Sequence, residues 1–319
     1  MSWRDGVHLT GTPIWCDARR RRDVCFVSSA DRVGRAGHGQ LIATPLTLAL
    51  LGARGAGHLG VPLRRRFTLG THRLELIASG RGPGGAVLHV DLAGKTVLYA
   101  GPIRGDVPST AGIDPTEVRT CDAVVVAAPF GEDRHAFPPI QLTVANTLEW
   151  ARAQLVAGRR PVLLVDTAID ALEVATCLAA VDLAVAGGRP IRDIAQRAAE
   201  VAPPGDKAPL VIASPGREPR ATVWLDEDRA GLQRAFADRP HVTALVSARA
   251  LDAGTTDAAF VWPSAAGRAE LLAWIESTNA RDVFVTGAAA DTIAAALGPR
   301  ARVIGPPHQM TLFPREATS

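Results

Sequence analysis

The hydrophobic pattern of the chain changes near Ile140, and this change constrains the fold more than any other feature. Before it, short apolar runs bounded by Gly, Pro and Asp predict strands, among them residues 24–27 and 123–128. After it, helical spacing alternates with short apolar runs, as where the predicted helix 168–180 follows the predicted strand 161–165. Such alternation is typical of layered α/β structure. We therefore expect a strand-rich first part followed by an α/β part.

Local turn and helix signals refine this outline. The apolar runs 87–92 and 96–100 flank Ala93-Gly94-Lys95, which predicts a tight hairpin. Residues 44–51 predict a short helix, and residues 268–277 predict a longer one.

Composition excludes several classes of protein. The chain has 319 residues, of which 47% are hydrophobic and 21% charged, so it can bury a substantial core and is neither disordered nor collagen-like. The net charge of only +3 does not indicate a protein that binds nucleic acids or membranes. Apolar runs such as 41–51 are too short to span a bilayer, and residues 1–6 contain no apolar segment typical of a signal peptide. These features predict a cytoplasmic protein without membrane contact.

Short chemical motifs give little support for a local active site. The four cysteines form no Cys-x-x-Cys pair, so we expect free, mostly buried thiols, and no two of the eight histidines lie closer than fourteen residues. Gly-x-Gly-x-x-Gly occurs at 55–60 and 80–85, but neither match lies between a strand and a helix, as a dinucleotide site requires. The basic runs 19–22 and 64–66 lack aromatic neighbours typical of nucleic-acid surfaces, and we expect solvated turns there.

Several segments, taken in order, resemble the metallo-β-lactamase-fold hydrolases. The nearest resemblance is to the bacterial ligase-associated DNA exonucleases, which are similar to RNA 3′-end processing nucleases. It implies an αββα sandwich, in which two mixed sheets pack face to face with helices outside, and a small inserted α/β cap domain. The sandwich would comprise 1–145 and 245–306, the cap 146–244 and a tail 307–319. The resemblance is carried by residues 11–18, 23–28, 33–35, 42–51, 74–86, 97–101, 121–122, 130–131, 135–139, 269–272 and 283–286.

Enzymes of this family hold two metal ions with a His-x-His-x-Asp-His signature, a further His, a bridging Asp and a last His. Such ligands let a bridging hydroxide form near neutral pH. In this chain the signature aligns with a two-residue deletion, and Asp31 is the one ligand that remains. Arginine is always protonated and proline has no side-chain donor atom, so these substitutions predict a protein without metal or catalytic residues. The substituted positions are Arg32, Arg81, Pro102, Ser264, Ala265 and Gly287.

The resemblance and the missing ligands together imply a catalytically inactive exonuclease relative that acts as a DNA-repair-associated scaffold or binds DNA ends. Arg32 and Arg81 would attract a phosphate in the former metal pocket, or Arg32 would pair with Asp31 and close it. Two other functions stay open. One is an active exonuclease or phosphodiesterase that holds zinc or manganese through rearranged ligands, with Asp31, His38 and Asp106 as nearest candidates. The other is a structural partner of a ligase or polymerase that binds no DNA.

The C-terminal tail carries a further signal. Gln309-Met310-Thr311-Leu312-Phe313 resembles the Gln-Leu-x-Leu-Phe peptide by which bacterial replication and repair proteins dock on the sliding clamp. The resemblance implies that the Gln309 amide lies on a polar rim while Leu312 and Phe313 fill an apolar cleft. The alternative is that Leu312 and Phe313 pack on the body of the protein.

Overall fold

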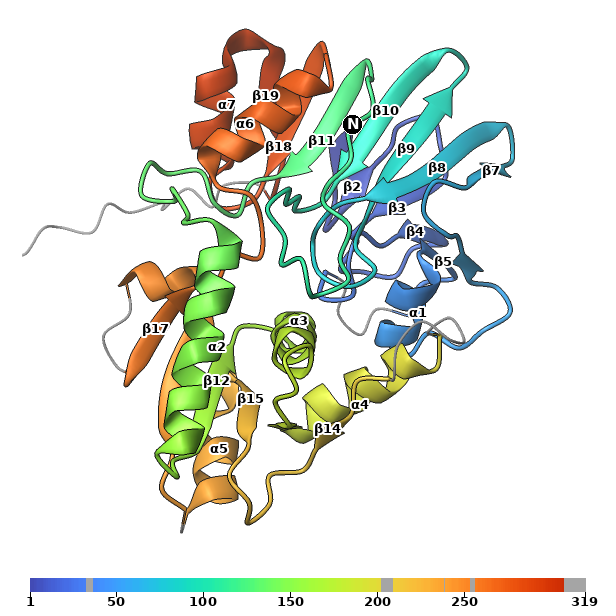
Figure 1. Cartoon of the computed structure of the whole chain (residues 1–319). Helices are drawn as coiled ribbons and strands as arrows, with labels where there is room; N and C mark the ends of the chain where they lie inside the picture. Colours follow the sequence, from blue (N-terminus) through green and yellow to red (C-terminus); the bar gives the residue numbers. More distant parts are fainter. Residues whose placement is uncertain (33–36, 202–208, 238, 253–255, 307–319) are drawn as a thin grey trace, which may run out of the picture.

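The computed structural model describes residues 1–32, 37–201, 209–237, 239–252 and 256–306 (Figure 1). In these ranges the chain forms a mixed α/β protein with three sheets and seven α-helices. Three 3₁₀ turns, η1 (Asp226–Asp228), η2 (Ala248–Asp252) and η3 (Gly298–Arg300), connect some of these elements. None of the helices in the described ranges has the length and apolar character needed to cross a membrane.

The first sheet is built by the N-terminal sixty residues. Its strands lie side by side in chain order, and from β3 onward they run parallel. The predicted short helix is α1 (Pro45–Leu51), which lies in the chain between the last two strands of this sheet. Thr44 caps it by accepting a 3.1 Å hydrogen bond from the Thr47 N–H, and Gly52 ends it in the left-handed region. The strands are β1 (Ser2–Trp3), β2 (Val7–His8), β3 (Ile14–Cys16), β4 (Val24–Phe26), β5 (Gln40–Ala43) and β6 (Leu59–Gly60).

The second sheet combines the middle of the chain with its C-terminal end, in the order β19-β18-β11-β10-β9-β8-β7. The predicted hairpin is confirmed: Leu92 pairs with Lys95 across a two-residue turn in which Ala93 and Gly94 both have positive φ. The strands are β7 (Arg66–Leu69), β8 (His72–Ala78), β9 (Ala86–Leu92), β10 (Lys95–Ala100), β11 (Ala123–Ala127), β18 (Asp282–Thr286) and β19 (Ala301–Val303).

The first two sheets pack against each other, with helices outside. Phe26 and Ile42 of the first sheet share a buried core with Leu76 and Leu88 of the second. The helices α6 (Arg268–Ser277) and α7 (Ala290–Leu297) cover the other face of the second sheet, and α1 packs on the other face of the first (Figure 1). The resulting order of layers is helix, sheet, sheet, helix.

The third sheet has the order β14-β13-β15-β12-β16-β17 and all its pairings are parallel. It extends past residue 244, the predicted end of the inserted segment, because β17 pairs in parallel with β16. Phe260 of β17 also packs edge to face on Trp150, which lies within the inserted segment. The chain returns to the second sheet only at β18. The strands are β12 (Pro161–Val165), β13 (Val185–Gly187), β14 (Ile212–Ala213), β15 (Ala221–Leu225), β16 (Val242–Ser247) and β17 (Ala258–Val261).

Helix α3 (Ala168–Ala179) lies between the third sheet and the rest of the molecule (Figure 1). Ile169 to Val174 are all buried, so this helix is enclosed on every side. Its two acidic residues, Asp170 and Glu173, are therefore buried as well. The other helices of this part are α2 (Ile140–Val156), α4 (Arg189–Ala199) and α5 (Arg229–Phe236).

Candidate functional site

The predicted metal positions lie in loops that follow strands. Arg81, Pro102 and Gly287 follow β8, β10 and β18, which run in the same direction and therefore end at one edge of the second sheet. The loop after β4 approaches this edge, because a Cβ atom added to Gly101 would lie 2.3 Å from the Ser28 Oγ. The fold thus brings these chain segments to one edge of the second sheet.

Arg81 is held between two carboxylates. Its Nη2 lies 2.6 Å from the Asp31 Oδ2 and its Nη1 lies 2.7 Å from the Asp170 Oδ1. The Ser29 Oγ donates a 2.6 Å hydrogen bond to the other Asp31 oxygen, and the Thr167 Oγ1 donates one of the same length to Asp170. Only 4% of the Arg81 side chain is exposed. Arg81 therefore has no access to a ligand in solvent.

The two carboxylates respond differently to the shared guanidinium. Burial tends to raise the pKa of Asp31, but Arg81, Ser29 and Arg32 outweigh it, and the pKa of Asp31 is lowered. At Asp170, burial prevails over Arg81 and the pKa is raised, with the nearby Asp31 charge adding to the rise. Asp31 is thus the carboxylate that holds its negative charge toward acid pH.

Glycines in the loop after β8 allow close packing against the Arg104 backbone and against helix α3. Gly80 and Gly82 have φ values of +72° and +62°. A Cβ atom at Gly80 would lie 1.7 Å from the Arg104 carbonyl oxygen, and one at Gly82 would lie 2.5 Å from the Ile169 Cγ2. Two glycines of this Gly-x-Gly-x-x-Gly match are therefore explained by close packing, Gly80 against the Arg104 backbone and Gly82 against α3.

A second buried ion pair lies beside the first and was not expected from the sequence. The Arg104 Nη2 lies 2.7 Å from the Glu173 Oε2, and each side chain is only 1% exposed. Arg104 also donates to the Pro263 and Gly80 carbonyl oxygens, and the Trp262 Nε1 donates to the Glu173 Oε1 at 2.7 Å. The signal that could have revealed it is the i, i+3 spacing of two acidic residues in an otherwise apolar helix. We call Asp31, Arg81, Arg104, Asp170 and Glu173 the buried ion-pair cluster.

One of the two sequence hypotheses paired Arg32 with Asp31. In the structure, Arg32 pairs with Asp17 instead. The Arg32 Nε lies 3.7 Å from the Asp17 Oδ2. Asp17 already accepts hydrogen bonds from the Ser28 N–H, the Ser28 Oγ and the Tyr99 hydroxyl, at 2.6–2.9 Å. Burial raises the pKa of Asp17, and Arg32 opposes that rise. One third of the Arg32 side chain, 33%, remains exposed.

Arg32 lines a pocket of 910 Å³ at the ends of β11 and β18, which we call the Arg32 pocket. Gly287, one of the predicted metal positions, lies on its wall and presents no side chain. The pocket also contains Arg19, whereas Arg81 is not among its lining residues. Other lining residues are Trp3, Ala127, Pro129, Thr286, Ala288, Ala290, Asp291, Val303, Ile304, Gly305 and Pro306.

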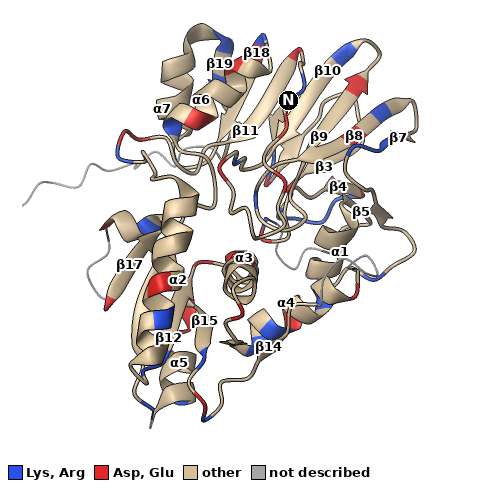
Figure 2. Cartoon of the chain, in the orientation of Figure 1, with Lys and Arg blue, Asp and Glu red and all other residues tan. Residues whose placement is uncertain are grey.

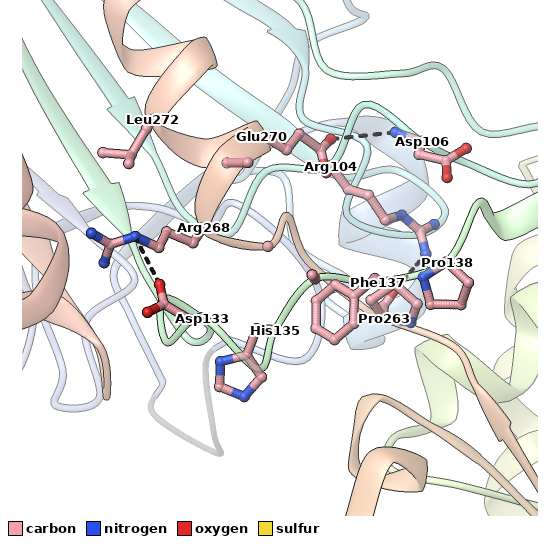
Figure 3. A pocket seen from close by; sticks show the side chains of 13 residues that line it. Arg104, Asp106, Asp133, His135, Phe137, Pro138, Pro263, Arg268, Glu270 and Leu272 are labelled. Carbon is pink, nitrogen blue, oxygen red and sulfur yellow. Dashed lines mark hydrogen bonds and ion pairs between the residues drawn. The ribbon is translucent and has the colours of Figure 1, made fainter.

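A second pocket, of 500 Å³, lies next to Pro263 and Gly267, which flank the predicted metal position Ala265 (Figure 3). In this view Asp106 lies at the right, Glu270 at the upper centre, and Arg268 with Asp133 at the left. We call it the Glu270 pocket.

The residues proposed as alternative metal ligands have other partners. Asp106 accepts a 2.7 Å hydrogen bond from the Ile140 N–H at the start of α2, and the His38 Nδ1 accepts one from the Arg22 N–H at 3.1 Å. Asp31 is bound by Arg81. Across the described ranges, no three His, Cys, Asp or Glu side chains form a group that could hold a metal ion. The donor set at the predicted positions therefore does not fit a pair of metal ions.

Outside these sites, the expectation of free, buried thiols is met, whereas the basic runs are not simply solvated turns, because Arg22 lies on an aromatic ring and Arg66 begins β7. All four cysteines are free and buried. The Arg22 guanidinium lies 3.7 Å from the Trp15 ring centroid while His8 stacks on the same ring system, and Arg64 pairs with Asp114 at 2.9 Å. Figure 2 shows acidic and basic residues interspersed along the chain, in agreement with the net charge of +3. Attraction of an anion would therefore depend on local arginines.

The predicted clamp-binding residues Gln309, Met310, Leu312 and Phe313 lie outside the described residues. Comparison with family models and with curated proteins gave no match to this chain.

Proposed function

We propose that this protein is a catalytically inactive relative of the metallo-β-lactamase-fold, ligase-associated DNA exonucleases, and that it serves DNA repair as a scaffold that binds phosphorylated DNA ends. The helix, sheet, sheet, helix order of layers supports this assignment. So does the position of the third sheet, which is inserted between β11 and β18 of the second sheet.

The observation that carries the inactive state is Arg81 between Asp31 and Asp170. A metal ion at this position would need neutral or anionic donors. The Arg81 guanidinium is instead a permanent cation, and it is bound to Asp31, the one family ligand that the sequence retains. A divalent ion that displaced the Arg81 side chain from Asp31 would also leave the buried Asp170 without its partner. Both effects act against metal binding and hydroxide activation.

The Arg32 pocket supports binding of a terminal phosphate. Within the described part of the chain, the Arg32 guanidinium makes no hydrogen bond, and its one ion pair is long at 3.7 Å. Arginine presents two parallel N–H groups that match phosphate oxygens, and Arg19 adds a second positive charge in the same pocket. A pocket of 910 Å³ has room for a terminal nucleotide.

DNA-binding anisotropy tests this function directly. We expect labelled DNA with a 5′ phosphate to bind the full-length protein at low salt, and Arg32→Ala to weaken binding about tenfold through loss of a charge-assisted contact. Arg54→Ala is the matched control, because Arg54 is 79% exposed and pairs with Glu200, away from the pocket. Equal affinity of wild type and Arg32→Ala would refute the phosphate site. No DNA binding at all would favour the purely structural partner.

A nuclease assay separates the inactive protein from the alternative enzyme. We expect no shortening of end-labelled DNA with zinc or manganese added. Hydrolysis that disappears in Asp31→Ala would overturn the inactive assignment and favour an active metal-dependent exonuclease.

The tail is proposed to dock on a bacterial sliding clamp through Gln309, Leu312 and Phe313. Replacement of Leu312 and Phe313 by Ala in the full chain should lower affinity for the clamp at least about tenfold, because these are the apolar anchors of the peptide. Unchanged affinity would remove the clamp from this function and leave the DNA-end site untouched.

A further inference from the structure

The Glu270 pocket has its own chemistry, independent of the proposed DNA-end site. It shares no lining residue with the Arg32 pocket. Its floor and sides are largely apolar, with Phe137, Pro138, Pro263 and Leu272 around the cavity (Figure 3). A concave apolar site with a few charged groups is typical of small-molecule binding.

The charges that line the Glu270 pocket are unevenly compensated. The Arg104 charge is matched by Glu173 outside the pocket, and Arg268 lies 3.6 Å from Asp133 and donates to the Gly131 carbonyl oxygen. The remaining charged groups are the carboxylates of Asp106 and Glu270. Neither forms an ion pair with any residue in the described ranges, whereas both arginines of the lining already have an acidic partner.

Each of these carboxylates uses one oxygen to bind backbone. The Glu270 Oε1 accepts from the Gly105 N–H and, at 3.3 Å, from the Asp106 N–H. The Asp106 Oδ2 accepts from the Ile140 N–H. These contacts fix the orientation of both groups at the rim. The second oxygen of each, Oε2 and Oδ1, makes no hydrogen bond with the residues that the structure describes.

An aromatic wall lies within the same cavity. Phe137 packs edge to face against Phe130, with ring centroids 5.1 Å apart, and also contacts His135. Both Phe137 and His135 line the pocket. An aromatic ring attracts a cation over its face and packs well against an alkyl stem.

We propose that the Glu270 pocket binds an organic cation, namely an alkylammonium or alkylguanidinium group on an apolar stem. The free oxygens of Glu270 and Asp106 accept hydrogen bonds from the cationic head, and the stem packs against Phe137 and Pro263. Such a head occurs on free small amines and on lysine or arginine side chains of peptides. The two sources share the same head group and differ in what is attached to the stem.

Titrations followed by amide NMR test this site in the full chain. N-acetyl-argininamide represents a peptide side chain, agmatine a free amine, and N-acetyl-norleucinamide an uncharged stem. We expect saturable shifts of the Gly105, Asp106 and Gly267 amides with at least one cationic probe below about 10 mM, and at least about tenfold weaker binding of norleucinamide. The cationic probe that binds more tightly identifies the source.

Matched variants locate the cation. Glu270→Gln and Asp106→Asn keep an oxygen for the backbone N–H groups but remove the charge, and each should weaken binding of the cation about tenfold. Glu227→Gln, an exposed carboxylate outside the pocket, should change nothing. Absence of saturable shifts, or equal binding of cation and norleucinamide, would overturn the site without any variant. Unchanged affinity in both pocket variants would overturn it as well, and none of these results bears on DNA binding by Arg32.

Discussion

Arg81 and Arg32 are both arginines that the sequence resemblance placed in one former metal pocket, yet their surroundings in the structure differ. Arg81 is 4% exposed and forms two ion pairs of 2.6 and 2.7 Å, whereas Arg32 is 33% exposed and its one ion pair with the described residues is 3.7 Å long. The difference arises because α3 supplies a carboxylate to Arg81 and none to Arg32. Two arginines at the same sheet edge can therefore differ, one being sealed by ion pairs and the other partly open to solvent.

Substitutions in the buried ion-pair cluster should lower the free energy of unfolding more than substitutions in exposed ion pairs. Two ions lose their hydration when they are buried, so such a pair adds little net stability, but removing one partner leaves an isolated buried charge. Exposed pairs are screened by water and salt, and their loss is small. Substitutions in the two environments test this contrast.

Glu173→Ala should have the largest effect. It leaves the Arg104 guanidinium and the Trp262 N–H without their buried acceptor, so we expect the free energy of unfolding to fall by about 3–5 kcal/mol. Urea unfolding followed by circular dichroism measures this loss. A loss below about 1 kcal/mol would show that Arg104 reaches solvent when Glu173 is removed.

A paired replacement serves as the control for that experiment. Arg104→Met combined with Glu173→Leu removes both charges and should recover about half of the lost stability, since an apolar pair of similar size replaces the ion pair. Full recovery is not expected, because Trp262 and Pro263 still lose their hydrogen-bond partners.

Asp31→Asn should have an intermediate, pH-dependent effect. Near neutral pH the variant loses one charge-assisted bond to Arg81, which costs about 2 kcal/mol. The folded pKa of Asp31 lies below its ordinary value of 3.8. Its contribution is therefore complete above pH 3.8 and decreases as pH falls through the lower folded pKa. Urea unfolding at several pH values should show wild type and variant converging in acid, and a gap that widens there would contradict the pairing.

Arg54→Ala should have the smallest effect. Arg54 is 79% exposed and its partner Glu200 is 47% exposed, so we expect a change in the free energy of unfolding of less than about 1 kcal/mol that vanishes in high salt. Thermal unfolding at two salt concentrations measures it. A larger effect that persists in salt would remove the energetic contrast between buried and exposed pairs.

Local patterns predicted many of the elements. The hairpin at Ala93-Gly94, the helix 45–51 and the strands 123–127 and 161–165 follow from nearby residues alone, because turn chemistry and hydrophobic spacing are local. The chain also brings Arg81 to the same sheet edge as Pro102 and Gly287, because the strands before them run in the same direction.

The partners of the site residues could not be predicted in this way. Asp31 and Arg81 are fifty positions apart, and Asp170 is a further eighty-nine positions from Arg81. Their meeting depends on how α3 packs over the glycines after β8, which no local pattern encodes. The extension of the third sheet to Val261 was missed for a similar reason, since pairing between β16 and β17 is a tertiary contact.

Anomalous scattering from crystals grown separately with zinc and manganese tests the central claim most directly. We expect no metal peak near Asp31, with Arg81 still bound to Asp31 and Asp170. A peak within about 2.2 Å of an Asp31 oxygen, with the Arg81 side chain displaced, would contradict the account.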